Sequence, residues 1–141
     1  MFRFRLEKIL QLRRKLRDAK KAELGYVDSQ IRAVEAELEG VYRSLRELDY
    51  PEGVASFGDL GRIFDTAEFL RRREKELLAR KKELYELRER VLSELVEHQK
   101  QVRILEKLKE KKGEEFRREM LKKEIAFLDD FASRRGNDVA D

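Results

Sequence analysis

Few residues in this chain could do chemistry. His98 is the only histidine and there is no cysteine, so a metal ion at His98 would need carboxylates or a second chain to complete its ligands. His98 also keeps the spacing of the neighbouring apolar residues, which favours a polar position in a helix seam over a ligand or pH-sensing role. Neither Thr66 nor any of the five serines has an obvious base beside it for nucleophilic catalysis.

Phosphate binding and carboxylate catalysis find no better support. The glycine-containing stretch 58–62 lacks the spacing and the Lys-Ser/Thr ending of a phosphate-binding loop. Paired Asp and Glu are abundant, but two packed helices offer no water-excluded pocket that would shift their pKa values. The sequence therefore predicts a protein that is not an enzyme, with no catalytic, metal or cofactor site.

The composition indicates which elements the chain forms. Charged residues make up 45% of the 141 residues and there is a single proline, whereas a compact domain is usually about 25% charged. The excess of Leu, Glu, Lys and Arg is typical of long helices and coiled coils. No apolar run approaches the roughly 18 residues of a membrane span, so we expect a soluble cytoplasmic protein.

Apolar residues in the first part of the chain follow the 3-4 alternation of a coiled coil, from Leu24 to Leu48. Upstream, the apolar residues keep helical spacing in a different phase, which predicts a four-residue stutter between Ala19 and Val27. The residues in that upstream phase are Phe2, Leu6, Ile9, Leu12, Leu16 and Ala19. A first helix is predicted over about 2–49.

Pro51 and Gly53 predict a chain reversal, with a turn over 50–62. Two capping-box-like pairs leave the start of the second helix open, at Ser56 with Asp59 or at Asp65 with Glu68. The second apolar stripe runs from Ile63 to Leu105, and charged residues occupy three of its seam positions, Glu74, Lys81 and Arg88.

A basic last turn before Gly136 predicts that the second helix, about 63–135, ends there and leaves a frayed tail over 136–141. The predicted fold over 1–141 is one all-α domain, a long two-helix antiparallel coiled-coil hairpin with the second helix longer than the first.

Unequal helices leave part of the second one uncovered. If the turn centres near residue 55, partners across the hairpin have numbers that sum to about 110, so residues after about 110 have no internal partner. The apolar residues of this overhang are Phe116, Met120, Leu121, Ile125, Phe127, Leu128 and Phe131. Such a surface marks an interaction site. The alternatives are self-association and a shifted N-terminus that covers it.

Net charge varies along the chain. Residues 1–21 carry +7, residues 28–60 carry −5 and residues 100–123 carry +5, which predicts a basic open end and an acidic turn end. We expect no nucleic-acid partner, because no base-reading module is recognisable. An amphipathic helix over 1–21 that lies on an anionic membrane is an alternative.

Three segments carry a resemblance to a known family: Phe2 to Leu10 (FRFRLEKIL) followed by Leu12-Arg13-Arg14, Val102 to Lys111 (VRILEKLKEK), and Leu128 to Ala132 (LDDFA). In order, spacing and total length the chain resembles the FliJ family, the small cytoplasmic component of the flagellar type III export apparatus. The resemblance implies a coiled coil similar to the central stalk subunit of rotary ATPases, with its open end seated in the ring of the flagellar export ATPase.

The resemblance also implies partners. These are the export ATPase, the cytoplasmic domain of the export gate and export chaperones, and they would hold a cytoplasmic protein peripherally at the inner membrane. We expect the ATPase to contact basic and apolar residues of the open end, namely Arg13, Arg14, Lys107, Lys111, Phe116, Met120, Leu121, Ile125, Leu128 and Phe131. The family pattern places the gate contact toward the turn, at Leu38, Tyr42, Leu45, Phe64, Phe69 and Leu70.

Two rival functions stay open. One is a general coiled-coil scaffold or a client-holding chaperone hairpin, akin to prefoldin arms, that binds unfolded chains. The other is a membrane-surface adaptor that binds through the basic N-terminal helix.

Overall fold

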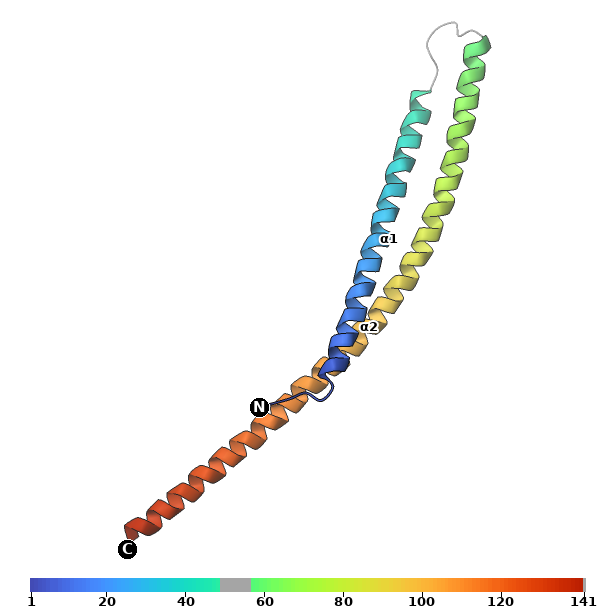
Figure 1. Cartoon of the computed structure of the whole chain (residues 1–141). Helices are drawn as coiled ribbons and strands as arrows, with labels where there is room; N and C mark the ends of the chain where they lie inside the picture. Colours follow the sequence, from blue (N-terminus) through green and yellow to red (C-terminus); the bar gives the residue numbers. More distant parts are fainter. Residues whose placement is uncertain (49–56, 141) are drawn as a thin grey trace. The chain divides into compact units, whose positions relative to one another are not determined.

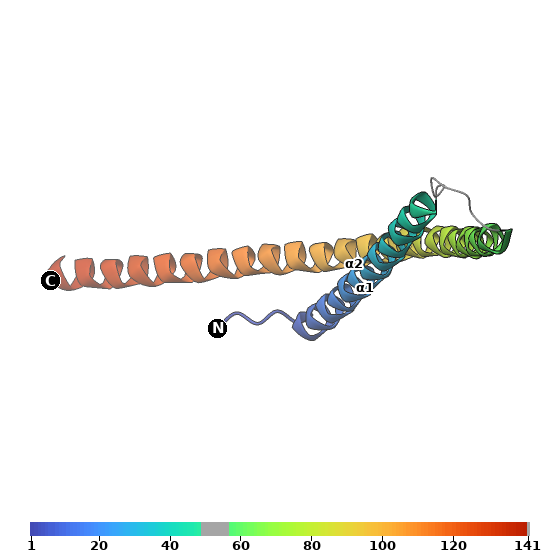
Figure 2. The same ribbon diagram turned by 90° about the horizontal axis from the view of Figure 1, so that it is seen from above.

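The computed structural model describes the backbone of residues 1–48 and 57–140, and the side chains of 1–48 and 58–136. Two helices account for most of it: α1, Glu7–Glu47, and α2, Phe57–Ala140, which is about twice as long. The colours run from blue to green along α1 and from green to red along α2, in opposite directions (Figures 1 and 2). The predicted all-α hairpin, with the second helix the longer, is confirmed.

The helix bounds differ from the predicted ones. α2 begins at Phe57 rather than Ile63, so residues 57–62 of the predicted turn are helical, and Asp59 lies in the first turn, where a carboxylate stabilises a helix N-terminus. α2 also continues past Gly136, whose backbone is not in the left-handed region that ends a helix. The predicted reversal at Pro51 and Gly53 lies outside the described residues.

The start of α1 also differs from the prediction. Residues 1–6 are not helical, and α1 begins where the Glu7 amide donates to the Phe4 carbonyl (3.1 Å) and the Leu10 amide donates to the Leu6 carbonyl (2.9 Å). The helical spacing of Phe2 and Leu6 therefore does not make a helix: residues 1–4 have no regular structure, and Arg5 and Leu6 form a turn.

The chain forms two compact units, and both helices contribute to each. We call Met1–Arg17 with Glu97–Asp141 the terminal unit, and Asp18–Val96 the central unit. Each is described by itself below.

The central unit has the predicted apolar seam. One cluster joins Val27 and Ile31 of α1 to Leu84 of α2, and a second joins Leu38 and Val41 to Leu77. The charged seam residues reach across to the other helix: the Arg88 guanidinium contacts Asp28 at 2.7 Å, Lys81 contacts Glu35 at 3.7 Å, and Glu74 accepts from the Tyr42 hydroxyl at 3.4 Å. The predicted alternation of apolar and charged seam residues is thus confirmed.

The predicted stutter in α1 is wrong. The 3-4 alternation continues unbroken from Leu24 back to Leu10, and half-buried Arg13, Arg17 and Lys20 occupy its intermediate positions. Long basic side chains can cover a seam with their methylene groups while their charged ends stay in water. The upstream apolar stripe at Ile9, Leu12 and Leu16 is therefore exposed.

Candidate functional site

The described side chains form no cluster suited to metal binding. None of them gathers three or more His, Cys, Asp or Glu residues around a possible ion. His98 is half-buried at the seam position that its spacing predicted, and its Nδ1 has no hydrogen-bond partner. The candidate sites are therefore surfaces.

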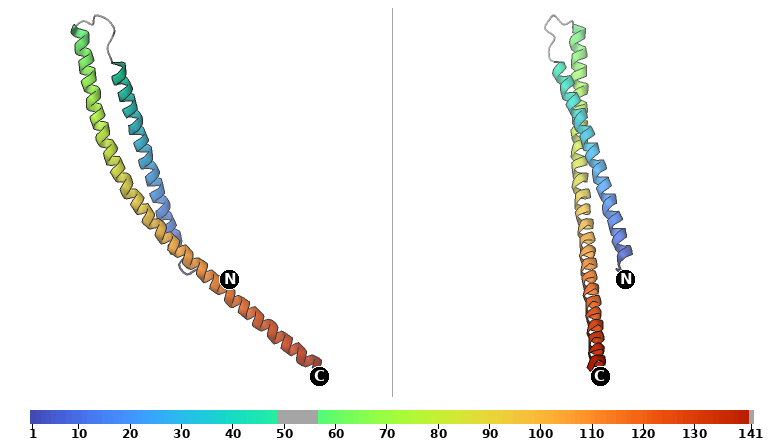
Figure 3. Two further views of the ribbon diagram at one scale, coloured as in Figure 1. Left: turned by 180° about the vertical axis from the view of Figure 1, so that it is seen from behind. Right: turned by 90° about the vertical axis from the view of Figure 1, so that its left-hand side faces the viewer.

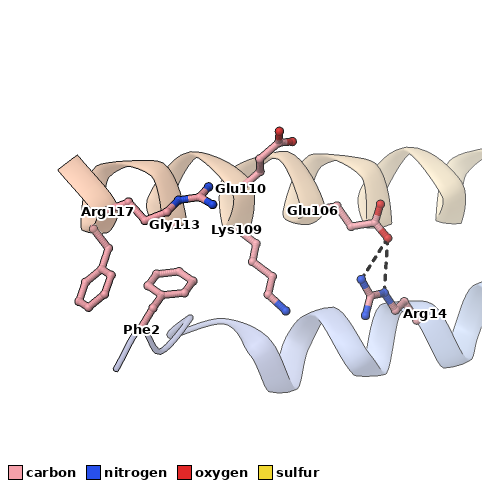
Figure 4. Close-up of a pocket in the computed structure, with 8 residues that line it drawn as sticks. Phe2, Arg14, Glu106, Lys109, Glu110, Gly113 and Arg117 are labelled. Atoms are coloured by element: carbon pink, nitrogen blue, oxygen red, sulfur yellow. Dashed lines mark hydrogen bonds and ion pairs between the residues drawn. The ribbon is translucent and has the colours of Figure 1, made fainter. Parts of the chain in front are cut away.

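In the terminal unit the N-terminal segment lies along α2. The Phe2 ring lies 5.6 Å from the Phe116 ring, centroid to centroid, at an interplanar angle of 44°, and it also approaches Gly113 (Figure 4). Residues 1–6, with Leu108 and Phe116, line an open groove of about 780 Å³. Phe116 is thus half-buried by the chain's own N-terminus.

This contact corrects the predicted start of the overhang. Glu7 pairs with Lys109 (2.8 Å) and Phe2 reaches Phe116, so the uncovered part of α2 begins after Phe116 rather than near residue 110. The reason is that a non-helical chain can advance up to about 3.3 Å per residue, against about 1.5 Å for a helix, so the residues that precede α1 reach farther along α2 than a helix would.

Beyond Phe116 the predicted apolar surface is present. Six large apolar side chains are 49% to 69% exposed, namely Met120, Leu121, Ile125, Phe127, Leu128 and Phe131. Within the terminal unit, no other described segment lies beside this stretch of α2 (Figure 3). At about 100° per residue the six side chains fall within half of the helix circumference. We call this surface the overhang patch.

The basic residues predicted to bind the ATPase divide into two pairs. Arg14 contacts Glu106 at 3.3 Å and Arg13 is half-buried in the seam, so both are engaged within the unit (Figure 4). Lys107 and Lys111 are exposed, and no described side chain pairs with either. Of the four predicted residues, these two lysines are the cations available to a partner.

The residues predicted to bind the export gate also divide. Leu38 is only 4% exposed, and Leu45 and Leu70 pack against its core cluster. The side chain of Leu38 fills the space between the helices, so little of its surface is accessible to a partner. Tyr42, Phe64 and Phe69 are exposed.

Two exposed residues near Tyr42 were missed from sequence. Leu78 and Tyr42 line the same shallow groove of the central unit, and the Tyr85 hydroxyl donates to Glu35 at 3.0 Å. That hydrogen bond to a carboxylate raises the pKa of Tyr85. The missed signal is positional: Tyr42, Leu78 and Tyr85 each directly follow a buried seam residue, which places them on one flank of the seam.

Together these features define a helical-hairpin protein that presents apolar surfaces. The family model described as flagellar FliJ protein matches residues 1–139, and the chain belongs to this family. No curated protein and no solved structure matches the chain. Family membership confirms the resemblance predicted from the three sequence segments, and it makes the chain a component of the flagellar export apparatus. Within the described ranges neither helix is long and apolar enough to cross a membrane.

Proposed function

We propose that this chain binds the flagellar export ATPase, the cytoplasmic domain of the export gate and export chaperones, and so promotes substrate export without doing chemistry itself. The observation that carries the proposal is the overhang patch, an uncovered apolar face on the family's own scaffold. These contacts would hold the chain in the cytoplasm, peripherally at the inner membrane.

The ATPase contact is assigned to the overhang patch together with Lys107 and Lys111. Apolar side chains that are half or more exposed gain free energy when a partner covers them, about 25 cal/mol per Å² of apolar surface. Lys107 and Lys111 precede the patch on the same helix, and unpaired lysines there attract an acidic surface and raise the rate of encounter. Phe116 lies just before the patch and is less accessible to a partner, because Phe2 already covers part of its ring.

The gate contact is assigned to exposed residues of the central unit. Tyr42 and Leu78 share one groove, and Phe64 follows seam residue Ile63 as Tyr42 follows Val41. Phe69 is exposed but precedes its seam residue, Leu70, so it belongs to the opposite flank. The gate surface would therefore centre on Tyr42, Leu78 and Phe64.

Truncation after Arg117 tests the ATPase contact, because it removes the overhang patch and keeps Phe116 against Phe2. We expect stimulation of the purified export ATPase to be lost while circular dichroism shows the remaining residues still helical. Phe64→Ser is the matched control, since it removes an exposed aromatic residue from the central unit, and it should leave stimulation intact. Unchanged stimulation by the truncated chain would refute the assignment. Equal binding to unrelated unfolded proteins would favour a client-holding chaperone.

A further inference from the structure

A second apolar surface of the terminal unit has no part in the proposed contacts. Ile9, Leu12 and Leu16 lie three and four residues apart on α1, so they form one stripe beside the seam residues Leu10 and Arg13. All three are exposed, although they are the residues that apolar spacing would place in the core.

α2 adds a residue to the same stripe. Arg13 and Leu105 are seam residues, and the residues that follow them, Arg14 and Glu106, form an ion pair on one flank of the seam. In an antiparallel pair, the residues that precede those seam residues share the opposite flank, at the same level. Leu12 and Ile104 therefore both lie on that opposite flank, one on each helix. We call Ile9, Leu12, Leu16 and Ile104, which are 39% to 65% exposed, the flank strip.

Unpaired cations border the flank strip on both helices. Lys8 and Lys15 lie along its outer edge on α1, and Lys100 and Lys107 along its outer edge on α2. All four lysines are exposed, and no described side chain forms an ion pair or hydrogen bond with them. The opposite flank differs, because Glu7 with Lys109 and Arg14 with Glu106 neutralise each other there.

We infer that the flank strip docks an amphipathic helix of a partner protein whose apolar face is flanked by acidic residues. Ile9, Leu12 and Leu16 repeat over two helical turns, as the anchors of a helix-in-groove contact do. A third helix on this flank would touch α1 and α2 together, and its carboxylates would meet the four lysines. This partner surface is separate from the overhang patch and from the gate residues.

The charge pattern favours this occupant over a second copy of the chain. The terminal unit has 19 Lys and Arg against 12 Asp and Glu, so the terminal units of two copies repel each other. Lys107 belongs to the residues assigned to the ATPase as well, so it is left unchanged in the test below.

The test uses the full chain and a labelled synthetic peptide of about three heptads, with Leu at the a and d positions and Glu at e and g. A control peptide carries Lys in place of every Glu. Fluorescence anisotropy at low salt should show binding of the Glu peptide and at least about tenfold weaker binding of the Lys peptide. Leu12→Ser with Leu16→Ser should weaken binding of the Glu peptide by about tenfold or more, because two apolar anchors are lost.

Two further variants sharpen the test. Lys8→Glu with Lys15→Glu should weaken binding of the Glu peptide and strengthen binding of the Lys peptide. Leu60→Ser is the matched control, since Leu60 (52% exposed) resembles Leu12 (57% exposed) but lies in the central unit, and it should bind as the unchanged chain does. All substituted side chains are exposed, and circular dichroism checks that each variant folds.

Several outcomes would overturn the inference. They are equal binding of both peptides, binding unchanged by Leu12→Ser with Leu16→Ser, strip-dependent sedimentation with phosphatidylglycerol vesicles in place of peptide binding, or a dimer that the same two substitutions dissociate. ATPase stimulation separates the two proposals, because the strip variants should keep it whereas truncation after Arg117 should abolish it.

Discussion

The central and terminal units use the same two helices in different ways. In the central unit the aliphatic residues at seam positions are buried or half-buried between the helices, and eight of the ten buried apolar residues among the described side chains lie there. Among the described side chains of the terminal unit, the buried apolar residues are Leu10 and Val102, and its other large apolar residues lie mainly on the flank strip and the overhang patch. The central unit buries its apolar residues between the helices, whereas the terminal unit leaves many of them exposed.

Charge separates the two units in the same way. The terminal unit carries a net +7, whereas the central unit, with 15 Lys and Arg against 18 Asp and Glu, carries −3. In the central unit many charges are paired across the seam, such as Arg73 with Glu37 at 2.7 Å. The cations of the terminal unit are less fully paired, which is what an acidic partner requires.

The largest expected effect tests where the stability of the protein resides. Leu84→Ala removes a buried side chain between Val27 and Ile31 and should lower the free energy of unfolding by about 2–4 kcal/mol. Leu128→Ala, the same change in the overhang patch, should cost less than about 0.5 kcal/mol. Urea denaturation followed by circular dichroism measures both. Similar losses of stability in the two variants would contradict the conclusion that the stability of the protein resides in the central unit.

The fold was largely predictable because seam spacing is a strong signal. The second stripe was predicted correctly, including its charged seam residues Glu74, Lys81 and Arg88. Each of them is followed, within one heptad, by an apolar residue at the next seam position, so the seam spacing continues. The stutter was predicted wrongly because the spacing argument assigned the most apolar residues to the seam. Between Leu10 and Leu24 the structure places basic residues at the seam positions instead, and their methylene groups cover the seam.

The candidate sites were less predictable than the fold. The overhang patch followed from the unequal helix lengths alone, but its beginning depended on whether residues 1–6 were helical. The gate residues show a different limit: Leu38 and Tyr42 are four residues apart, yet one is buried and the other exposed. Only the register of both helices separates a seam residue from its flanking neighbour.

The next effect tests how the terminal unit closes at its end. Phe2→Ala removes the ring that covers Phe116. It should lower the local free energy of unfolding at the start of α1 by about 1–2 kcal/mol. Hydrogen exchange at the Glu7 and Leu10 amides should become faster, while exchange in the central unit stays the same. Phe2→Leu is the control, because leucine still covers Phe116 and only the contact between two aromatic rings is lost. Its exchange rates at Glu7 and Leu10 should therefore lie between those of the unchanged chain and those of Phe2→Ala. Faster exchange in both units would contradict the expectation that this contact affects the terminal unit alone.

A smaller effect of opposite sign is expected at Gly113. Its amide lies inside α2, and an added Cβ would meet the Phe2 ring at 3.7 Å, an ordinary contact distance. Gly113→Ala should therefore raise stability by about 0.5–1 kcal/mol, because alanine favours the helix and the unfolded chain loses freedom. Gly25→Ala in the central unit, where the added Cβ meets nothing, is the comparison. A loss of stability at Gly113 alone would show that Phe2 packs more tightly than this distance implies.

The smallest effect concerns pH and the neutralised flank of the terminal unit. The hydrogen bond from Lys109 lowers the pKa of Glu7, and Gln11 lowers it further. A carboxyl whose folded pKa lies below its unfolded value stabilises the fold above the unfolded value, near pH 4.5, and this contribution is lost as the pH falls through the folded pKa. Protection near the start of α1, taken as the intrinsic exchange rate divided by the observed rate, should therefore fall more on acidification in the unchanged chain than in Glu7→Gln. Because Glu7 lies opposite the flank strip, the variant should leave binding of the acidic peptide intact. Weaker peptide binding by Glu7→Gln would mean that the two flanks are coupled and that the strip is not the sole determinant of docking.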